Sequence, residues 1–372
     1  MVSSSWPSKN KTEPRDDGAG KGTPRQYSFP NAQYPHPSAR TRDMNILFIG
    51  GTGNISTDCA ALLAQRGHRI SVLTRGRNPV PAAYQSIVAD RHDRAALQQA
   101  LAGKSFDVVA DFTTYTEDDA RTMVELFAGR CAQYVFISTV VVYSKPARVL
   151  PITELAPIGN AFSPYGQHKA AAEAFFMQQH REHGFPVTIV RPSHTYSRQW
   201  LPNPVTSAGY TFARRLEEKR PIFIHDDGQG LWTLTHTRDF AVGFAGLCGL
   251  DEAIGEAIQI TGDAVLTWNQ IIEEIRLALG VKSMDIEHIP TDFICHVAPD
   301  MTAKFKGDKS SPAVFDCAKL KRLVPDSQCR IPFRDGAREA VAWFKADPAR
   351  QSINPAVDAI FDRIINAWRN AR

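Results

Sequence analysis

A tyrosine and a lysine four residues apart stand near the middle of the chain, at Tyr165 and Lys169 in the segment YGQHK. On a helix this spacing puts both side chains on one face. An ammonium beside a phenol favours the phenolate, so Lys169 is expected to pull the pKa of Tyr165 from about 10 toward neutrality. Tyr165 would then be a general acid/base for an alcohol–ketone pair, with Thr139 orienting the substrate oxygen. Because such pairs are common on helix surfaces, the assignment depends on its context.

A glycine-containing turn supplies that context. The apolar run Asn45–Ile49 predicts a buried parallel strand, and the segment GGTGNIS joins it to a helix. Gly50 allows a tight turn, and Gly53 lets backbone N–H groups approach a pyrophosphate at the helix N-terminus. The alternative is an ordinary glycine-rich turn, but the dinucleotide motif requires this strand–turn–helix arrangement. The cofactor contacts expected here are Gly50, Thr52, Gly53, Asn54 and Ile55.

Residues after the following strands would select the form of the cofactor. A site for NAD usually has an acid after the second strand, whereas this chain has Arg75. A guanidinium suits a 2′-phosphate, so NADP(H) is favoured within NAD(P), unless Arg75 is only a solvated surface side chain. Asp90 is placed to bond the adenine amino group, and Lys169 the nicotinamide ribose. The further cofactor contacts expected are Arg91, Phe112, Thr113, Tyr165 and Pro192.

Strands and helices alternate along this part of the chain. The strand candidates are Asn45–Ile49, Arg69–Thr74, Ser86–Asp90, Asp107–Asp111, Tyr134–Ser138 and Val187–Arg191. Repeated βα units predict a parallel sheet with helices on both faces, which is a doubly wound α/β domain. The last third is more helical, with a capping-box pattern at Thr267 and a cap followed by proline at Asn354.

These motifs together resemble the extended short-chain dehydrogenases/reductases, and within them the NAD-dependent epimerase/dehydratase family, which works largely on nucleotide sugars. The resemblance runs from about Met44 to about Phe344. It is carried by Gly50-x-x-Gly53, Ser138-Thr139 followed by Val142-Tyr143-Ser144, Tyr165-x-x-x-Lys169 and Arg191-Pro192. It implies a Rossmann domain with a smaller C-terminal α/β substrate lobe, hydride transfer to a nicotinamide, and a homodimer as the default assembly. We expect residues 44–205 and 236–262 in the Rossmann lobe, and residues 206–235 and 263–372 in the substrate lobe.

Three places depart from the family pattern. Val140 and Val141 stand where the dehydratases carry an Asp-Glu pair, so 4,6-dehydration is not expected. Trp232 replaces an arginine that binds the substrate pyrophosphate. His194 replaces an asparagine that faces the substrate, and it is either a second acid/base or a structural histidine. The expected substrate contacts are Val140, His194 and Trp232.

A lysine-containing loop, KFKGDK, offers another source of positive charge. Lys304, Lys306 and Lys309 could replace the missing arginine, or they could form ordinary solvated surface.

Composition excludes several classes of protein. The 372 residues are 43% apolar and 22% charged, as in soluble globular proteins, and no apolar run is long enough to span a membrane. Residues 1–43 hold seven basic and four acidic side chains, so of the total charge of +4 only +1 remains for the rest. That charge is too small to indicate a nucleic-acid partner. Residues 1–43 are expected to form a disordered extension. The six scattered cysteines predict reduced thiols in a cytoplasmic protein and form no metal-ligand pattern.

The sequence therefore predicts an NAD(P)-dependent oxidoreductase or epimerase that acts on a secondary alcohol of a sugar or nucleotide-sugar-like substrate. Two alternatives stay open. One is an NADPH-dependent ketoreductase on a small non-nucleotide carbonyl, which Trp232 favours. The other is a non-catalytic, cofactor-binding or RNA-associated regulator.

Overall fold

A parallel sheet forms the centre of the N-terminal lobe. The computed structural model describes residues 43–206 and 208–372, so the predicted disordered extension lies outside the described residues except for Asp43. The strands are β1 (Asn45–Ile49), β2 (Arg69–Thr74), β3 (Gln85–Val88), β4 (Phe106–Asp111), β5 (Cys131–Ile137), β6 (Val187–Pro192) and β10 (Ala257–Ile260). Their order is β10-β6-β5-β4-β1-β2-β3, and every neighbouring pair is parallel. This order confirms the doubly wound prediction and puts a ligand crevice between β1 and β4, where the order reverses.

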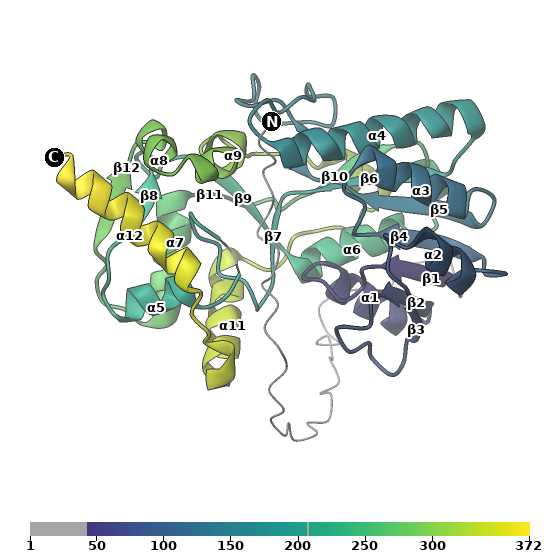
Figure 1. The fold of residues 1–372 in the computed structure, drawn as a ribbon, viewed down its shortest axis with the longest axis horizontal. Helices are drawn as coiled ribbons and strands as arrows, with labels where there is room; N and C mark the ends of the chain where they lie inside the picture. The colour runs from purple at the N-terminus through teal and green to yellow at the C-terminus, as the bar shows by residue number, and fades with distance from the viewer. Residues whose placement is uncertain (1–42, 207) are drawn as a thin grey trace.

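Helices cover both faces of this sheet (Figure 1). One face carries α1 (Ser56–Gln65), α6 (Thr237–Leu247) and α10 (Ala318–Leu323), and the other carries α2 (Arg94–Ala100), α3 (Glu117–Phe127) and α4 (Pro164–His183). In β1, Ile46 and Phe48 pack toward the first set, whereas Leu47 and Ile49 pack toward the second. The central strands β1 and β4 are largely apolar because both of their faces are buried, whereas β3 at the edge of the sheet is mostly exposed.

The second lobe is built from short strands and a helical layer. Its strands form a sheet of β11 (Val265–Thr267), β9 (Leu231–His236) and β7 (His194–Tyr196), and a pair of β12 (Ile286–Ile289) and β8 (Ile222–His225). Its helices are α5 (Thr211–Glu217), α7 (Trp268–Leu279), α8 (Thr291–Val297), α9 (Thr302–Lys304), α11 (Phe333–Lys345) and α12 (Pro355–Asn370). Thr267 forms the expected capping box, and Asn354 caps α12 by accepting from two backbone N–H groups.

Short helical turns complete the fold. They are the 3₁₀ turns η1 (Val140–Val142), η2 (Asp251–Ala253), η3 (Pro299–Met301) and η5 (Pro348–Arg350), and the π-helical turn η4 (Phe305–Lys309).

The chain passes between the lobes several times. Helix α6 packs on the sheet of the first lobe, and β10 is a strand of that sheet. Leu320 and Val324 also belong to the core on that face, although they come from within residues 263–372, which the sequence analysis assigned to the substrate lobe. Residues 318–324 thus pack on the Rossmann lobe.

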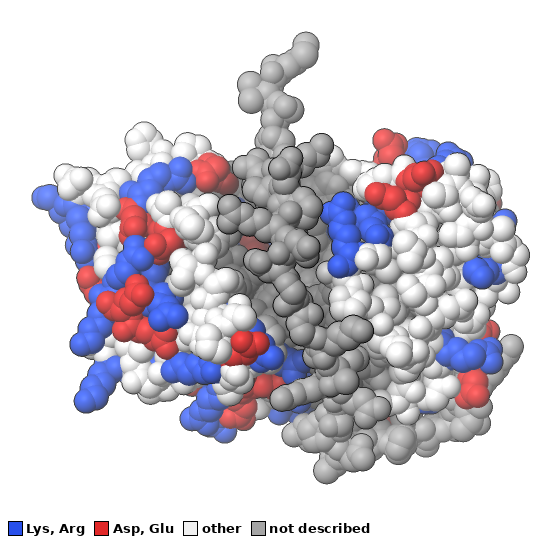
Figure 2. All heavy atoms as spheres, turned by 60° about the horizontal axis from the view of Figure 1, so that its bottom comes forward, with Lys and Arg blue, Asp and Glu red and all other residues white. Residues whose placement is uncertain are grey.

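The described surface is mixed in charge. On the face drawn in Figure 2, basic and acidic side chains lie interspersed over both lobes. Within residues 43–206 and 208–372, no helix has both the length and the apolar character needed to cross a membrane.

Candidate active site

A cavity of about 580 Å³ lies between the lobes, at the carboxyl ends of the parallel strands. Most of the predicted site residues line it: Gly50, Gly53, Asn54, Ile55, Phe112, Thr113, Thr139, Val140, Tyr165, Lys169, Pro192, His194 and Trp232. Four predicted cofactor contacts, Thr52, Arg75, Asp90 and Arg91, are not part of its wall. The fold therefore brings the glycine turn, the Tyr/Lys pair and the predicted substrate contacts into one space.

Ser56 closes the glycine turn after β1. Its Oγ donates to the Gly50 carbonyl oxygen at 2.8 Å and accepts from the Gly53 N–H at 2.9 Å. Gly50 has φ +82°, and a Cβ there would overlap the Thr113 side chain, so glycine is required at this position. The turn directs the N-terminus of α1 toward the cavity, where Asn54 and Ile55 line the wall.

Tyr165 lies in the first turn of α4, against the loop that carries Thr139. Ser163 caps the helix by accepting from the Gly166 N–H at 3.1 Å. A Cβ at Gly166 would stand 2.5 Å from the Val141 carbonyl oxygen, so glycine allows the helix to approach this loop closely. The approach brings Tyr165 into hydrogen-bonding contact with Thr139.

The hydroxyl end of Tyr165 is shielded, although 39% of the residue as a whole is exposed. Its ring stacks on Tyr115, with the ring centroids 5.7 Å apart. Burial raises the pKa of Tyr165 to about 12, and the hydrogen bond with Thr139 opposes this rise. The expectation that Lys169 draws this pKa toward neutrality is therefore wrong for this arrangement, because the ammonium has other partners.

Lys169 is held at the ends of two strands. Its Nζ donates to the carbonyl oxygens of Thr114 at 2.6 Å and Ile137 at 2.8 Å, and the residue is 5% exposed. Burial lowers its pKa to about 8, while the nearby Asp111 carboxylate opposes this effect. The lysine is thus a fixed donor at the edge where β4 and β5 end.

Asp111 organises the loop after β4, and sequence reasoning missed it. Its carboxylate accepts from the Thr113 N–H at 2.7 Å and from the Tyr134 hydroxyl at 2.6 Å. Arg91 donates to the Thr113 carbonyl oxygen and pairs with Asp119 at 2.6 Å. Arg91 therefore supports the loop and does not line the cavity. An acid at the last position of a buried strand was the signal that could have revealed Asp111.

The residues predicted for the adenosine end are exposed beside β2 and β3. Arg75 and Asp90 are both exposed, and Asp90 Oδ1 accepts from the His92 N–H at 3.0 Å. That hydrogen bond, together with Arg75 and Arg77, lowers the pKa of Asp90. The two predicted residues thus lie near each other but outside the enclosed part of the site.

The model of the NAD dependent epimerase/dehydratase family matches residues 46–260, which include the glycine turn, Thr139, Tyr165 and Lys169. The chain belongs to this family. It is thus an extended short-chain dehydrogenase/reductase, as its motifs predicted.

The family's relatives include proteins with different named roles. The chain is 27% identical over 267 residues to chloroplast stem-loop binding protein of 41 kDa b from Arabidopsis thaliana, covering 68% of each chain. It is 26% identical over 291 residues to 2'-dehydrokanamycin reductase from Streptomyces kanamyceticus, covering 77% of this chain and 81% of the reductase. The fold resembles UDP-glucuronic acid 4-epimerase from Bacillus cereus, solved in complex with NAD, with TM-score 0.64 and 20% identity over 82% of this chain and 99% of the epimerase.

Trp232, a predicted substrate contact, is part of an aromatic block. It is 2% exposed and packs against Trp268 with ring centroids 5.2 Å apart. Lys309 Nζ lies 4.7 Å from the Trp268 ring centroid and 5.9 Å from that of Trp232, within reach of cation–π attraction. Trp232, backed by Trp268, therefore forms part of the cavity wall.

His194 lies beside that block. Its ring meets Trp232 edge-on, with centroids 6.3 Å apart. Burial, and secondarily the charge of Lys309, holds the pKa of His194 well below 6.5. The imidazole is neutral at neutral pH, so it can exchange hydrogen bonds with a substrate but does not store a second proton.

Asp308 faces the cavity from the π-helical turn η4, and sequence reasoning missed it. Asn160 joins this turn to the loop that carries Thr139, because its Nδ2 donates to Gly307 O at 2.7 Å and to Val141 O at 2.9 Å. Burial raises the pKa of Asp308, and the charges of Lys309 and Lys145 oppose this rise. A carboxyl group is thus positioned on the substrate side of the cavity.

The three lysines of this loop have separate environments. Lys306 pairs with Asp292 at 2.7 Å, and Lys304 donates to the Val205 carbonyl oxygen at 2.9 Å. Lys309 is 5% exposed, so it is not part of a solvated surface, which was the alternative interpretation of this loop. The KFKGDK pattern was the sequence signal for this part of the site.

The residues present fit a nicotinamide dinucleotide. The cavity extends from the N-terminus of α1, suited to a diphosphate, to the Tyr165–Lys169 face of α4. Within the described residues, the Ser138 hydroxyl lines this space and is buried with no hydrogen-bond partner, as expected of a group that awaits a polar ligand.

Proposed function

We propose that the protein is a nicotinamide-dependent oxidoreductase that interconverts a secondary alcohol and a ketone on a compact, sugar-like substrate without a nucleoside diphosphate. The observation that carries this proposal is the single cavity lined by the glycine turn, Thr139, Tyr165 and Lys169. The glycine turn is suited to bind a cofactor, and the Tyr/Lys pair is suited to act on an oxygen-bearing carbon. Their position in one cavity would bring that carbon next to the cofactor.

Tyr165, Thr139 and Lys169 have separate roles in the proposed reaction. When bound, the cofactor supplies or accepts the hydride. In the direction of reduction, the Tyr165 hydroxyl donates its proton to the substrate oxygen, and in oxidation it takes the proton back. The Thr139 hydroxyl orients that oxygen, and Lys169 holds the ribose side of the cofactor from its fixed place on the strand ends. With its pKa at about 12, Tyr165 is protonated at neutral pH and so carries the proton that reduction requires.

The cavity wall argues against a diphosphate on the substrate. Among its described residues, Lys169 and Asp308 are the only Lys, Arg, Asp or Glu side chains, and only Asp308 lies toward the substrate side. A diphosphate would meet a carboxylate and packed indoles where other family members have an arginine. Val140 and Val141 likewise supply no proton for dehydration. The similarity to a reductase named for a kanamycin derivative supports a sugar-like carbonyl.

NADP(H) is the form of the cofactor that we favour. Arg75 is exposed beside β2, close enough to Asp90 to affect its pKa, and therefore available to a 2′-phosphate at the rim.

A nucleotide-sugar epimerase is the second candidate. The buried Lys145 and Lys309 lie near Asp308 and could offset its charge toward an anionic substrate. If the hydride returned to the opposite face of the same intermediate, Thr139, Tyr165 and Lys169 would act in the same way and the net reaction would be epimerisation.

One substrate panel separates these candidates. Purified protein is assayed for NADPH and NADH oxidation with ketosugars and small carbonyls, and for thermal stabilisation by UDP-, GDP-, CDP- and dTDP-sugars. Ligands that bind only the native state raise its melting temperature. We expect turnover of a non-nucleotide carbonyl and no shift with nucleotide sugars. A cofactor-dependent shift with one nucleotide sugar, without carbonyl turnover, would favour the epimerase.

The regulator alternative draws on the relative named for stem-loop binding. It requires no turnover from any substrate, so a single turned-over carbonyl argues against it. A cytoplasmic location and a homodimer stay predictions.

A further inference from the structure

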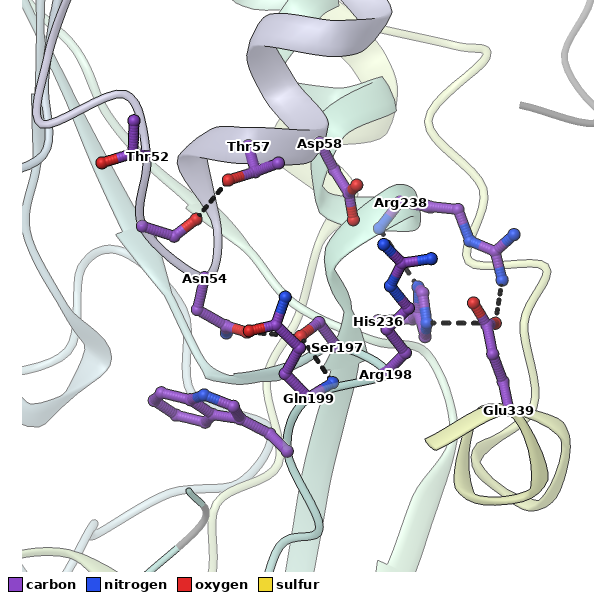
Figure 3. Close-up of a pocket in the computed structure, with 12 residues that line it drawn as sticks. Thr52, Asn54, Thr57, Asp58, Ser197, Arg198, Gln199, His236, Arg238 and Glu339 are labelled. Atoms are coloured by element: carbon purple, nitrogen blue, oxygen red, sulfur yellow. Dashed lines mark hydrogen bonds and ion pairs between the residues drawn. The ribbon is translucent and has the colours of Figure 1, made fainter. Parts of the chain in front are cut away.

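A second, smaller cavity of about 290 Å³ lies at the seam between the lobes, next to the glycine turn (Figure 3). The first turn of α1 and the start of α6 form one side, and Glu339 on α11 faces them from the substrate lobe. Gly53, Asn54 and Trp200 line both this cavity and the larger one, so the two adjoin. The proposed reaction gives no role to the side of this space lined by His236, Arg238 and Glu339.

His236 presents a buried donor to this cavity. It caps α6, and its Nδ1 accepts from the Arg238 N–H at 3.1 Å. Burial holds the pKa of His236 at about 3, so the ring is neutral and its one proton lies on Nε2. His236 is 3% exposed, and within the described residues Nε2 has no hydrogen-bond partner. A buried N–H without an acceptor is rare, and an acceptor bound in the cavity would satisfy it.

Glu339 shows that the groups facing this cavity can bind a carboxylate. One of its carboxylate oxygens, Oε2, pairs with the Arg238 guanidinium and lies 3.8 Å from His236 Nε2. Its side chain is 36% exposed, so this carboxylate can move away into solvent. An oxyanion at the same place would reach both groups.

The remaining charges around the cavity are Arg198 and Asp58. Arg198 adds a second guanidinium to the wall. Asp58 accepts from the Thr237 hydroxyl at 2.5 Å. Burial raises its pKa, and this hydrogen bond and the charges of Arg238 and Arg198 oppose the rise. Helices α1 and α6, of 10 and 11 residues, both begin here, and the positive ends of their dipoles favour an anion.

We propose that this cavity is a second ligand site, which binds a small oxyanion such as a phosphate or carboxylate group through Arg238 and His236, in competition with Glu339. A ligand there would bridge the lobes beside the cofactor turn. The same chemistry could come from a free anion or from the cofactor's own diphosphate, because the two cavities share Asn54.

Calorimetric titration of the full chain with inorganic phosphate tests the site. Sodium chloride keeps the ionic strength constant, so that general screening does not contribute. We expect saturable binding by the wild type. Repeating the titration with saturating NADPH distinguishes the two sources. A phosphate Kd that changes less than threefold supports a separate site, whereas full competition assigns the phosphate to the cofactor's diphosphate position and overturns the proposal.

Two variants should move the phosphate affinity in opposite directions. Arg238→Gln removes the charged donor and should weaken binding about tenfold or more, since charge-assisted hydrogen bonds are the strong ones. Glu339→Gln removes the competing carboxylate and should tighten binding about threefold or more. Both variants lose the same ion pair between the lobes, so damage to the fold cannot produce opposite shifts. Matched controls are Arg181→Gln and Glu252→Gln, which are exposed elsewhere.

The proposal fails if the wild type gives no saturable heat with phosphate. It also fails if the Arg238 and Glu339 variants bind phosphate with the wild-type affinity, or if both weaken it.

Discussion

Glu173 and Arg191 form an ion pair inside the Rossmann lobe, with Arg191 Nη2 2.5 Å from Glu173 Oε2 and each side chain 4% exposed. Arg191 Nε also donates to both oxygens of the carboxylate, at 3.0 and 3.2 Å. Glu173 follows Lys169 by one turn of α4, and Arg191 precedes Pro192 at the end of β6. The pair therefore fixes the helix that carries Tyr165 and Lys169 against the strand that borders the cavity.

Glu173→Gln should destabilise the protein strongly. The substitution leaves the Arg191 charge buried without its counter-charge, which costs about 3–5 kcal/mol. The free energy of unfolding is measured by urea denaturation, with Glu252→Gln as an exposed control that should stay within about 0.5 kcal/mol of wild type. A loss of unfolding free energy below about 1 kcal/mol would contradict this contribution of the ion pair.

Tyr165→Phe should abolish turnover but keep cofactor binding. Loss of a general acid/base lowers kcat by about 10²–10⁴-fold, whereas the ring's packing on Tyr115 is kept. Turnover of the best carbonyl from the substrate panel and the Kd of NADPH are compared with Tyr84→Phe, a control outside the cavity. Turnover near the wild-type rate would remove Tyr165 from the mechanism.

Lys309→Met should change the pH dependence of stability. Burial lowers the pKa of Lys309 to about 8, so between pH 8 and about 10.4 the unfolded chain keeps a proton that the folded chain has lost. Stability rises with pH wherever the unfolded state binds more protons. The wild type should therefore gain up to about 1.4 kcal/mol per pH unit relative to the variant in this window.

Urea denaturation of both proteins at pH 7, 8, 9 and 9.5 measures that difference. Below pH 8 the difference should be flat, because Lys309 is then protonated in both states. A constant difference across the whole range would mean that the buried lysine does not titrate there.

Arg75→Asp should weaken NADPH binding far more than NADH binding. The substitution replaces the cation expected at the 2′-phosphate by a carboxylate, which should cost about tenfold or more in the Kd of NADPH. Arg130→Asp, exposed at the start of β5, is the charge-matched control. Equal losses for the two cofactors would contradict the assignment of NADP(H).

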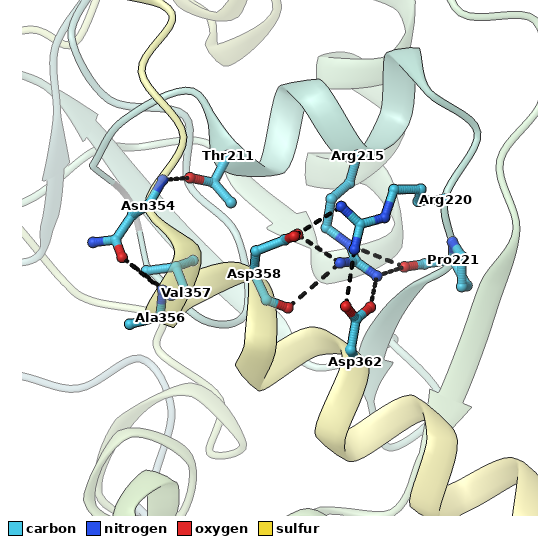
Figure 4. Close-up of polar contacts among 9 residues, drawn as sticks. All are labelled: Thr211, Arg215, Arg220, Pro221, Asn354, Ala356, Val357, Asp358 and Asp362. Atoms are coloured by element: carbon cyan, nitrogen blue, oxygen red, sulfur yellow. Dashed lines mark hydrogen bonds and ion pairs between the residues drawn. The ribbon is translucent and has the colours of Figure 1, made fainter.

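Arg215→Met should loosen the C-terminal helix. Arg215 is fully buried and donates to Asp358 at 2.6 Å, Asp362 at 2.7 Å and Pro221 O at 2.7 Å (Figure 4). Within the described residues, its loss leaves the partly buried Asp358 paired only with Arg220, which should cost about 2–4 kcal/mol of the free energy of unfolding. Proteolysis near α12 and urea denaturation measure the effect, with the exposed Arg181→Met as control. Wild-type resistance to both would show that apolar contacts alone dock α12.

Much of the Rossmann lobe follows from local sequence patterns. The runs Asn45–Ile49 and Arg69–Thr74 are strands with the predicted bounds, because short, mainly apolar segments between turns fit strands that are buried on both faces. The third strand is displaced: it covers Gln85–Val88, and Ala89 and Asp90 follow it. Strand ends are set by pairing with β2, which the local pattern does not contain.

The sequence by itself determined that Gly50, Thr139, Tyr165 and Lys169 would be near one another, because strand ends and a helix face follow from residue spacing. Only the tertiary structure decided what each group touches. Lys169 binds two backbone carbonyls instead of lowering the pKa of Tyr165. Lys309 is buried against two indoles that come from other elements. Spacing specifies which way a side chain points, whereas its partners and its pKa depend on burial by segments far away in the chain.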